Sequence, residues 1–214
     1  MGIEDRKKRE KKMLEEMRVQ QIQNAAEEVF IRKGFNSATI EEIAKKAELS
    51  PATIYLYFKN KDELYASLNL ITLTYLYTQI EAVYANRSLS CEEKIIGFKD
   101  ALYKTYQYRP IILKIIFHLQ LNEGLLSLSE ELLDKLNGLS QLIMEMIAAV
   151  YKEGVEKGIF IPGHKNAHAD ILWAVFTGLI LWEDAKKQLN PKKDFLKPTL
   201  DRAFDIFLRG IKVS

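Results

Sequence analysis

Residues 39–64, TIEEIAKKAELSPATIYLYFKNKDEL, constrain the fold more than any other stretch, because they begin two helices in close succession. Thr39 is a favoured N-cap residue and Glu42 follows three positions later, which predicts a capping box. The apolar residues after Thr39 recur on one helical face, and they include small residues that let a second helix cross closely. Ser50 followed by Pro51 predicts the next helix N-terminus. The spacing therefore predicts a helix-turn-helix.

In a helix-turn-helix, the N-terminal end of the second helix meets base edges in the major groove. Pro51, Ala52 and Thr53 occupy that end, whereas Ile54 and Phe58 are expected to turn inward and hold the helix. No Arg, Asn or Gln lies in residues 51–58, so bidentate base contacts are not expected from this helix. The pattern predicts a DNA-binding regulator whose affinity comes mainly from phosphate contacts.

Residues 21–68 resemble the N-terminal domain of the TetR family of transcriptional repressors. The resemblance rests on the helix ending in Phe30, on Gly34-Phe35, on Thr39 before IEEIAKKA, and on SPATIYLYFKNKDEL. It implies an all-α chain of about nine helices. In such a chain an N-terminal three-helix head carries the helix-turn-helix, and a C-terminal helical body binds ligand and forms a homodimer.

The resemblance also implies roles for single residues in the head. Phosphate contacts are expected from Thr39, Tyr55, Tyr57 and Lys61, although packing at the edge of the core is the alternative for both tyrosines. The full set of predicted DNA-binding residues is Thr39, Lys45, Ser50, Pro51, Ala52, Thr53, Tyr55, Tyr57 and Lys61. The chain departs from the family at Glu48 and Ala52, where glycine is frequent. A left-handed conformation at Glu48 would cost about 1 kcal/mol or more.

Composition agrees with an all-α protein and narrows its chemistry. The chain has five prolines, ten glycines and a 48% hydrophobic content, without a long alternating β-branched run. Cys91 is the single cysteine, which excludes an internal disulfide and a CxxC metal site. The charged N-terminus lacks a signal sequence, and no apolar stretch is long enough to span a bilayer, so a cytoplasmic protein is expected. The formal net charge of +2 alone does not indicate DNA binding.

Three segments are predicted: a charged extension at 1–20, the DNA-binding domain at 21–66, and the ligand-binding and dimerisation domain at 67–214. The basic residues of the extension would form an arm along phosphates or in a minor groove. The favoured alternative is a solvated, frayed extension whose charges are balanced by its own acidic residues.

The body is predicted to consist of helices at about 61–85, 90–108, 110–121, 129–157, 167–189 and 195–211. The last two helices carry wide apolar faces, and the resemblance implies that they form a four-helix bundle with a second copy. On the first of them the face comprises Ile171, Leu172, Val175, Phe176, Leu179 and Ile180, with Ala174 and Gly178 allowing close approach. On the second it comprises Leu200, Ala203, Phe204, Phe207 and Leu208.

The resemblance implies that the body contains a cavity for a small-molecule effector, and the middle helices are expected to line it. Apolar residues dominate there and acidic ones are scarce, so a lipophilic effector is expected. The candidate residues are Tyr75, Tyr103, Tyr106, Phe117, His118, Leu121, Met144, Trp173 and Phe176. Ordinary core packing is the alternative for each. Resemblance to regulators of fatty-acid degradation suggests an acyl-CoA or a fatty acid.

The sequence gives little evidence for a metal site or an enzyme. His164 and His168 have the spacing of metal ligands but lack a third ligand, so no metal site or other cofactor is predicted. No phosphate-binding loop and no GxSxG or HExxH motif is present, so an enzyme is not expected. The prediction is a repressor released from a palindromic operator by its effector. The alternative is a TetR-like protein that acts through protein contacts without sensing a small molecule.

Overall fold

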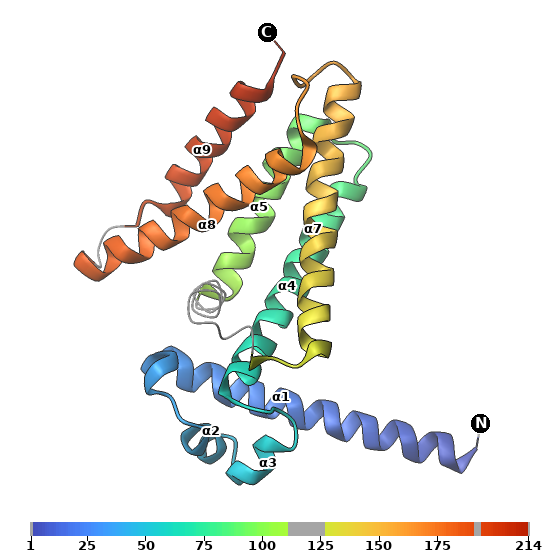
Figure 1. Cartoon of the computed structure of the whole chain (residues 1–214), viewed down its shortest axis with the longest axis vertical. Coiled ribbons are helices and arrows are strands. Elements are labelled where there is room, and N and C mark those ends of the chain that lie inside the picture. The colour runs from blue at the N-terminus through green and yellow to red at the C-terminus, as the bar shows by residue number, and fades with distance from the viewer. Residues whose placement is uncertain (1, 111–126, 191–193, 214) are drawn as a thin grey trace. The chain divides into compact units, whose positions relative to one another are not determined.

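The computed structural model describes residues 2–110, 127–190 and 194–213, and it is all-α over these ranges apart from one short backbone pairing. Figure 1 follows the chain through eight described helices. They are α1 (Ile3–Ser37), α2 (Ile40–Lys46), α3 (Pro51–Tyr55), α4 (Lys61–Ala85), α5 (Cys91–Tyr108), α7 (Glu130–Glu156), α8 (Lys165–Leu189) and α9 (Leu196–Ile211). The fold class is as predicted. The expected helix starting at Pro110 falls almost entirely outside the described residues.

Contacts divide the described chain into two compact units. The first comprises residues 2–69 and 127–133, and the second comprises residues 70–110, 134–190 and 194–213. α4 and α7 each begin in the first unit and end in the second. The boundary predicted between residues 66 and 67 remains a prediction.

The first unit is built on α1, whose N-terminal part is a long exposed helix. Residues 3–20 continue the helix, and ion pairs such as Arg6–Glu10, at 2.9 Å, link side chains four residues apart along it. Gly34 interrupts α1 with φ of 76°, a conformation that glycine adopts without strain. Glycine is therefore favoured at this break in α1.

The core of the first unit comes from the apolar stripes of α1 to α4. Its most deeply buried side chains are Ile22, Phe30, Ile43, Ile54, Leu64 and Leu68. Two long-range hydrogen bonds fix α1 against its neighbours. Gln21 Nε2 donates to Ala47 O at 2.7 Å, and Gln23 Nε2 donates to Ser67 Oγ at 3.0 Å inside the core. The Gln23 amide is buried, so its satisfied hydrogen bond restricts how α1 and α4 can pack.

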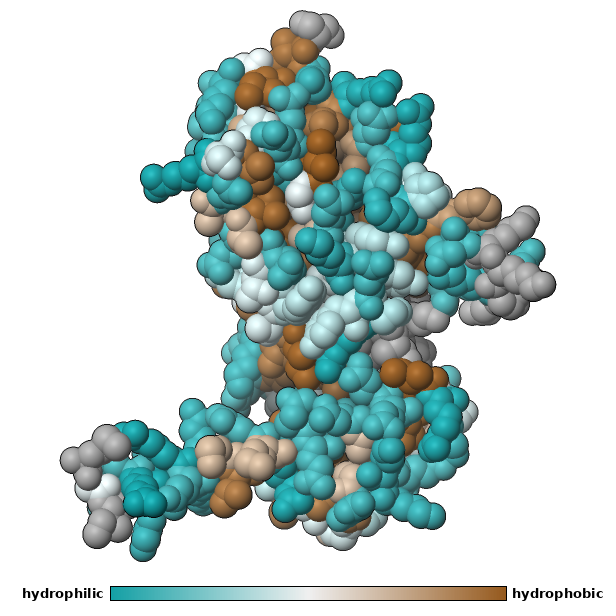
Figure 2. Space-filling model, turned by 180° about the vertical axis from the view of Figure 1, so that it is seen from behind, coloured by the Kyte–Doolittle hydropathy of each residue, from teal (hydrophilic) through white to brown (hydrophobic). Residues whose placement is uncertain are grey.

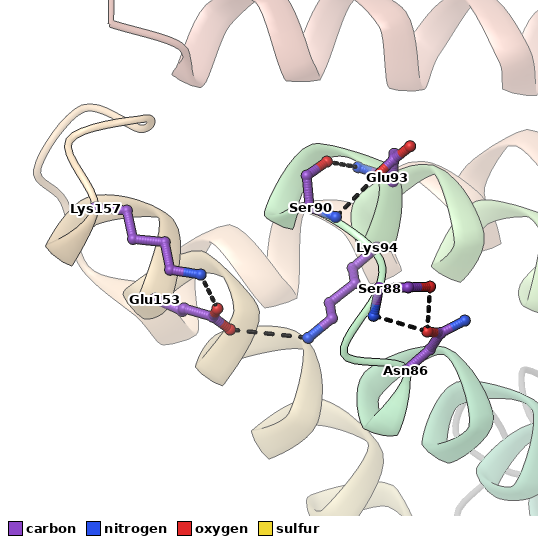
Figure 3. Close-up of polar contacts among 7 residues, drawn as sticks. All are labelled: Asn86, Ser88, Ser90, Glu93, Lys94, Glu153 and Lys157. Atoms are coloured by element: carbon purple, nitrogen blue, oxygen red, sulfur yellow. Dashed lines mark hydrogen bonds and ion pairs between the residues drawn. The ribbon is translucent and has the colours of Figure 1, made fainter.

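The second unit packs the remainder of α4 and α7 with α5, α8 and α9. At the connection between α4 and α5, Ser90 caps α5 and forms a capping box with Glu93 (Figure 3). Lys94 is 7% exposed and lies 3.9 Å from Glu153 of α7, which also pairs with Lys157. The Lys157 hydrogen bond is the main cause that lowers the pKa of Glu153 below its ordinary value. A buried cation is thus kept beside an ionised carboxylate.

The end of the chain is held by a short antiparallel pairing. Ile161 N donates to Ile211 O at 2.7 Å, and Val213 N donates to Ile159 O at 3.0 Å. This pairing joins the connection after α7 to the last turn of α9. No β-ladder was predicted there, and the pairing is too short to form a strand in the described chain.

The apolar faces of α8 and α9 divide differently from the prediction. Leu172, Phe176 and Ile180 of α8 are buried within their own chain, as are Leu200 and Phe204 of α9. The exposed part of α8 instead contains Ile171, Ala174, Gly178, Leu181 and Trp182, and α9 exposes Ile206 and Gly210. The predicted apolar face of α8 therefore combines residues from two sides of the helix. One side packs against its own chain, and the other side is exposed.

Candidate nucleic-acid interface

The N-terminus of α2 is fixed by Thr39. Thr39 Oγ1 accepts a hydrogen bond from Glu42 N at 3.3 Å, so the predicted N-cap is present. The reciprocal half of the capping box is not among the described contacts, because the Glu42 carboxylate accepts from Lys33 of α1. That hydrogen bond lowers the pKa of Glu42 below its ordinary value. Thr39 itself is exposed and can be reached by a ligand.

The turn between α2 and α3 passes through a left-handed residue. Glu48 has φ of 55° and is the one non-glycine residue with positive φ in the described chain. Leu49 N donates to Ala44 O at 2.9 Å and closes the turn. The conformation expected from the family's glycine is therefore present here with a glutamate, which carries the steric cost of a β-carbon.

α3 is short and presents one face to solvent. Ser50 Oγ accepts from Thr53 N at 3.1 Å, and Pro51 follows in the first turn, as predicted. Pro51 and Ala52 are exposed and Thr53 is half-buried. Ile54 is fully buried and Phe58 is 6% exposed, so both turn inward as expected.

The two tyrosines differ in their surroundings. Tyr55 is 53% exposed at the end of α3, which leaves its hydroxyl open to solvent. Tyr57 is half-buried in the turn that follows, where its backbone N–H donates to Ile54 O at 3.0 Å. Tyr55 and the exposed Lys45 of α2 both contribute polar groups to the surface around α3.

Lys61 begins α4 as predicted, but its side chain turns into the protein. Its Nζ donates to Phe35 O at 2.8 Å and to Ala38 O at 2.9 Å. It also lies 4.3 Å from the centroid of the Phe35 ring. Neither acceptor is a neighbour in sequence, so no local pattern indicated this arrangement.

Asn60, which was not singled out from the sequence, has two partners at the start of α4. Its Oδ1 accepts from Glu63 N at 2.7 Å, and its Nδ2 donates to Ser127 O at 3.2 Å. The first contact is that of an N-cap, for which asparagine is a favoured residue. The position of Asn60 before Asp62-Glu63 was the available signal for the cap. The partner at residue 127 could not be inferred from the sequence.

The described candidate effector residues of the second unit are buried or half-buried, and two of them, on the same helix, lie close together. Tyr75, Tyr103, Tyr106, Met144 and Trp173 are half-buried, and Phe176 is buried. Trp173 and Phe176 lie with ring centroids 6.2 Å apart, and Tyr75 stacks on Tyr108 at 4.5 Å. Phe117, His118 and Leu121 lie outside the described residues.

The two histidines near the start of α8 have local structural roles. His164 Nδ1 caps α8 by accepting from Ala167 N at 3.3 Å. His168 stacks on Tyr151 with centroids 3.8 Å apart, and its Nδ1 lies 2.9 Å from His164 O. Among the described residues, no group of three or more His, Cys, Asp or Glu side chains could hold a metal ion. No described helix is long and apolar enough to cross a membrane.

Comparison of the sequence with known proteins agrees with this geometry. The family described as "Bacterial regulatory proteins, tetR family" matches residues 22–68, which contain α2, α3 and the start of α4. The regulator QacR of Staphylococcus aureus is 23% identical over 194 residues, which cover 89% of this chain and 96% of that protein. The fatty acid metabolism regulator protein of Bacillus subtilis is 28% identical over 142 residues, which cover 64% of this chain and 68% of that protein.

Solved structures share the fold. PfmR, a TetR family regulator from Thermus thermophilus, superposes with a TM-score of 0.71 at 21% identity, covering 90% of this chain and 99% of its own. FadR from Bacillus subtilis, solved in complex with stearoyl-CoA, has a TM-score of 0.69 at 21% identity and covers 90% of this chain and 98% of its own. These proteins are transcriptional regulators rather than enzymes.

Proposed function

The chain belongs to the TetR family of transcriptional regulators, and we propose that it is a repressor whose homodimer leaves a palindromic operator when a lipophilic effector binds. The observation that supports DNA contact through α3 is its division into two faces. Ile54 is buried beneath the helix, whereas Pro51, Ala52 and Tyr55 are exposed above it. That is the arrangement a recognition helix requires.

We assign the exposed and half-buried residues of this surface to two kinds of contact. Thr39, Lys45, Tyr55 and Tyr57 are proposed to bind phosphates, since hydroxyl groups and ammonium groups are common phosphate donors. Pro51, Ala52 and Thr53 are proposed to face bases, where they offer apolar contact to thymine methyl groups and one hydroxyl. Ser50 caps the helix that presents them.

Dimerisation is proposed through the exposed faces of α8 and α9. Trp182 is 61% exposed and Ile171 is 46% exposed, although both are large apolar side chains on one helix. Ala174 and Gly178 lie at helical spacing from Ile171 and are small enough for close approach of a second helix. A two-fold axis would bring the same face of the partner against this one. Two recognition helices about 34–36 Å apart would then meet successive major grooves.

A long-chain acyl-CoA or fatty acid is the proposed effector. Half-buried Tyr75, Tyr103 and Trp173 support an apolar site in the second unit. FadR from Bacillus subtilis, which shares the fold, was solved with stearoyl-CoA. α4 carries both Tyr75 and, at its first residue, Lys61, so an effector that favours a different placement of α4 would change the DNA-binding unit. Only a ligand that prefers the non-binding state can release DNA.

The experiment titrates stearoyl-CoA, stearate and a lipophilic aromatic cation against the protein bound to a fluorescent duplex from upstream of its own gene. Stearoyl-CoA or stearate should lower duplex affinity by about 5–150-fold, which corresponds to a coupling of about 1–3 kcal/mol. By reciprocity, the duplex should weaken effector binding by the same factor. A duplex complex that none of these molecules weakens would contradict the proposed sensing, while DNA binding itself would stand.

A further inference from the structure

We propose that Lys61 is a positioning residue, which holds the N-terminus of α2 in place for DNA and does not itself bind a phosphate. The proposal rests on the DNA contact proposed for Thr39. It assigns the ammonium to the turn between α1 and α2, where its two hydrogen bonds lie.

The ammonium group of Lys61 already has partners within the protein. An ammonium has three N–H donors, and two of them are directed at Phe35 O and Ala38 O. The face of the Phe35 ring lies 4.3 Å from Nζ and adds a cation–π contact. Phe35 is in turn packed on Tyr65 of α4, with ring centroids 4.5 Å apart. A phosphate would have to compete with these partners for the same charge.

Local partial charges explain why a lysine suits this place. A cation at the N-terminus of α4 is unfavourable with respect to the dipole of α4 itself. The carbonyl oxygens of Phe35 and Ala38, which follow the break in α1 at Gly34, carry partial negative charge and accept from Lys61. Hydrogen bonds that involve a charged donor are stronger than neutral ones. These two contacts offset the unfavourable position of Lys61 on α4.

The turn that Lys61 holds leads directly into the DNA-binding surface. Ala38 is 1% exposed and immediately precedes Thr39, the N-cap of α2. Within the turn, Ala38 N donates to Phe35 O at 3.4 Å, and Lys61 joins both of these residues to α4. Loss of the ammonium would release the turn from α4, so Thr39 would no longer be presented at a fixed position.

The test compares Lys61→Met, which keeps the apolar stem, and Lys61→Arg, which keeps the charge, with Lys45→Met on exposed α2. Affinity for the upstream duplex is measured by anisotropy between about 50 and 200 mM salt, where each phosphate contact contributes about 0.9 to the logarithmic slope. Lys61→Met should weaken binding about 10-fold with the slope unchanged, and Lys61→Arg, which keeps a charged donor group, should retain most of the affinity. Lys45→Met should lower the slope by about one contact.

Two further readouts separate positioning from a general loss of stability. Adding Lys61→Met to Thr39→Ala should weaken binding by no more than about threefold beyond Thr39→Ala alone, because both changes act through the same contact. In the DNA-free protein, amide exchange at residues 38–42 should accelerate in Lys61→Met, whereas exchange in α5 should not change. This measurement remains informative if the wild-type protein binds no duplex, a result that would contradict the proposed function instead.

A slope that falls in Lys61→Met as it does in Lys45→Met would overturn the proposal in favour of a phosphate contact. Unchanged affinity together with unchanged exchange at residues 38–42 would overturn it as well. If Lys61→Met does not fold, Lys61→Leu, which also lacks a side-chain donor, takes its place in every measurement.

Discussion

Glu48 adopts a backbone conformation that is sterically unfavourable for a residue with a β-carbon. Its φ of 55° closes the turn between α2 and α3, and its side chain is exposed. The turn is kept by the caps at Thr39 and Ser50, which fix the two helices on either side of it. Left-handed backbone is unfavourable for a residue with a β-carbon but not for glycine.

Replacing Glu48 by glycine should therefore stabilise the protein by about 1 kcal/mol, because the steric cost is removed. The gain would be partly offset by the greater freedom of glycine in the unfolded chain. The midpoint of urea unfolding measures the effect, with Glu48→Ala as the control that removes the carboxylate but keeps the β-carbon. Equal midpoints for the glycine and alanine variants would contradict the assignment of strain.

At the same scale, the sequence indicated contacts that are local and missed those that are not. Thr39 and Ser50 bind amides three residues away, so their caps were predicted correctly. The partners of Lys61 are 23 and 26 residues away, and their position depends on how α4 packs against α1. Glu42 was expected to complete a capping box, but Lys33 offers its carboxylate a stronger, charged partner.

At the scale of elements, polar residues fix how α5 and α9 pair in the second unit. Asp201 of α9 accepts from Lys99 of α5 at 2.5 Å and from Lys197 at 2.8 Å. Lys99 is mostly buried, with its side chain 12% exposed. The Lys197 and Lys99 hydrogen bonds lower the pKa of Asp201 below its ordinary value of 3.8. The carboxylate is therefore ionised in the folded protein to lower pH than in the unfolded chain.

This lowered pKa gives Asp201 a pH-dependent contribution to stability. A depressed pKa in the folded state stabilises the protein above the unfolded value and loses that effect as pH falls through the folded value. Asp201→Asn should cost about 1 kcal/mol or less near pH 7, since solvent screens the partly exposed carboxylate. The cost should shrink below about pH 4.

Urea unfolding of the wild type and of Asp201→Asn at both pH values measures this difference. Asp205→Asn is the matched control on α9, because Asp205 pairs only with arginines of its own helix in the described contacts. A destabilisation by Asp201→Asn that is equal at pH 7 and pH 3 would contradict the electrostatic origin.

The start of α4 offers a second test at the scale of elements. Asn60→Asp keeps the side-chain oxygen that accepts from Glu63 N. It replaces the Nδ2 donor with an oxygen, which would then face Ser127 O without a hydrogen bond. Duplex affinity without effector should stay within about threefold of the wild type, because the cap is retained. Amide exchange at residues 128–133 should accelerate. Protection that is unchanged there would show that the Ser127 contact contributes nothing to this segment.

The helix boundaries after residue 60 followed from the sequence, whereas the faces of α8 and α9 did not. Caps, glycines and prolines act within one turn, so the ends of α4 and α5 could be predicted closely. Phe176 and Ile171 look alike in a helix that is apolar on both sides. Which of them faces its own chain depends on the neighbouring helices, and the structure assigns Phe176 to the core.

At the scale of the whole molecule, the proposal requires two chains. Apolar side chains also emerge elsewhere, for example Met13, Leu14 and Met17 on the first half of α1, each more than half exposed (Figure 2). The α8 surface differs because it continues over successive turns and contains the small residues Ala174 and Gly178, beside which a second helix could pack closely. An exposed apolar surface of that kind indicates an interface.

Gly178→Arg and Trp182→Glu should therefore yield folded monomers, since a charge would be buried unpaired in the dimer but exposed in the single chain. Sedimentation equilibrium measures the mass, and circular dichroism verifies the fold. Leu142→Glu, at a 46% exposed residue of α7, is the control that should stay dimeric. Phe176→Arg should instead destabilise the single chain, because Phe176 is 1% exposed within it. Dimers that persist in both α8 variants would contradict this interface.

The most direct test of the account is duplex binding by Ala52→Glu. Ala52 is exposed on α3, so the substitution should leave the fold intact while directing a carboxylate at the DNA. Ile31→Glu, at a 62% exposed position on α1, is the matched control. Measured by anisotropy with the upstream duplex, Ala52→Glu should weaken binding by at least about 30-fold, or about 2 kcal/mol, and Ile31→Glu by less than about threefold. If Ala52→Glu is folded and binds the duplex as tightly as the wild type, α3 is not the recognition helix.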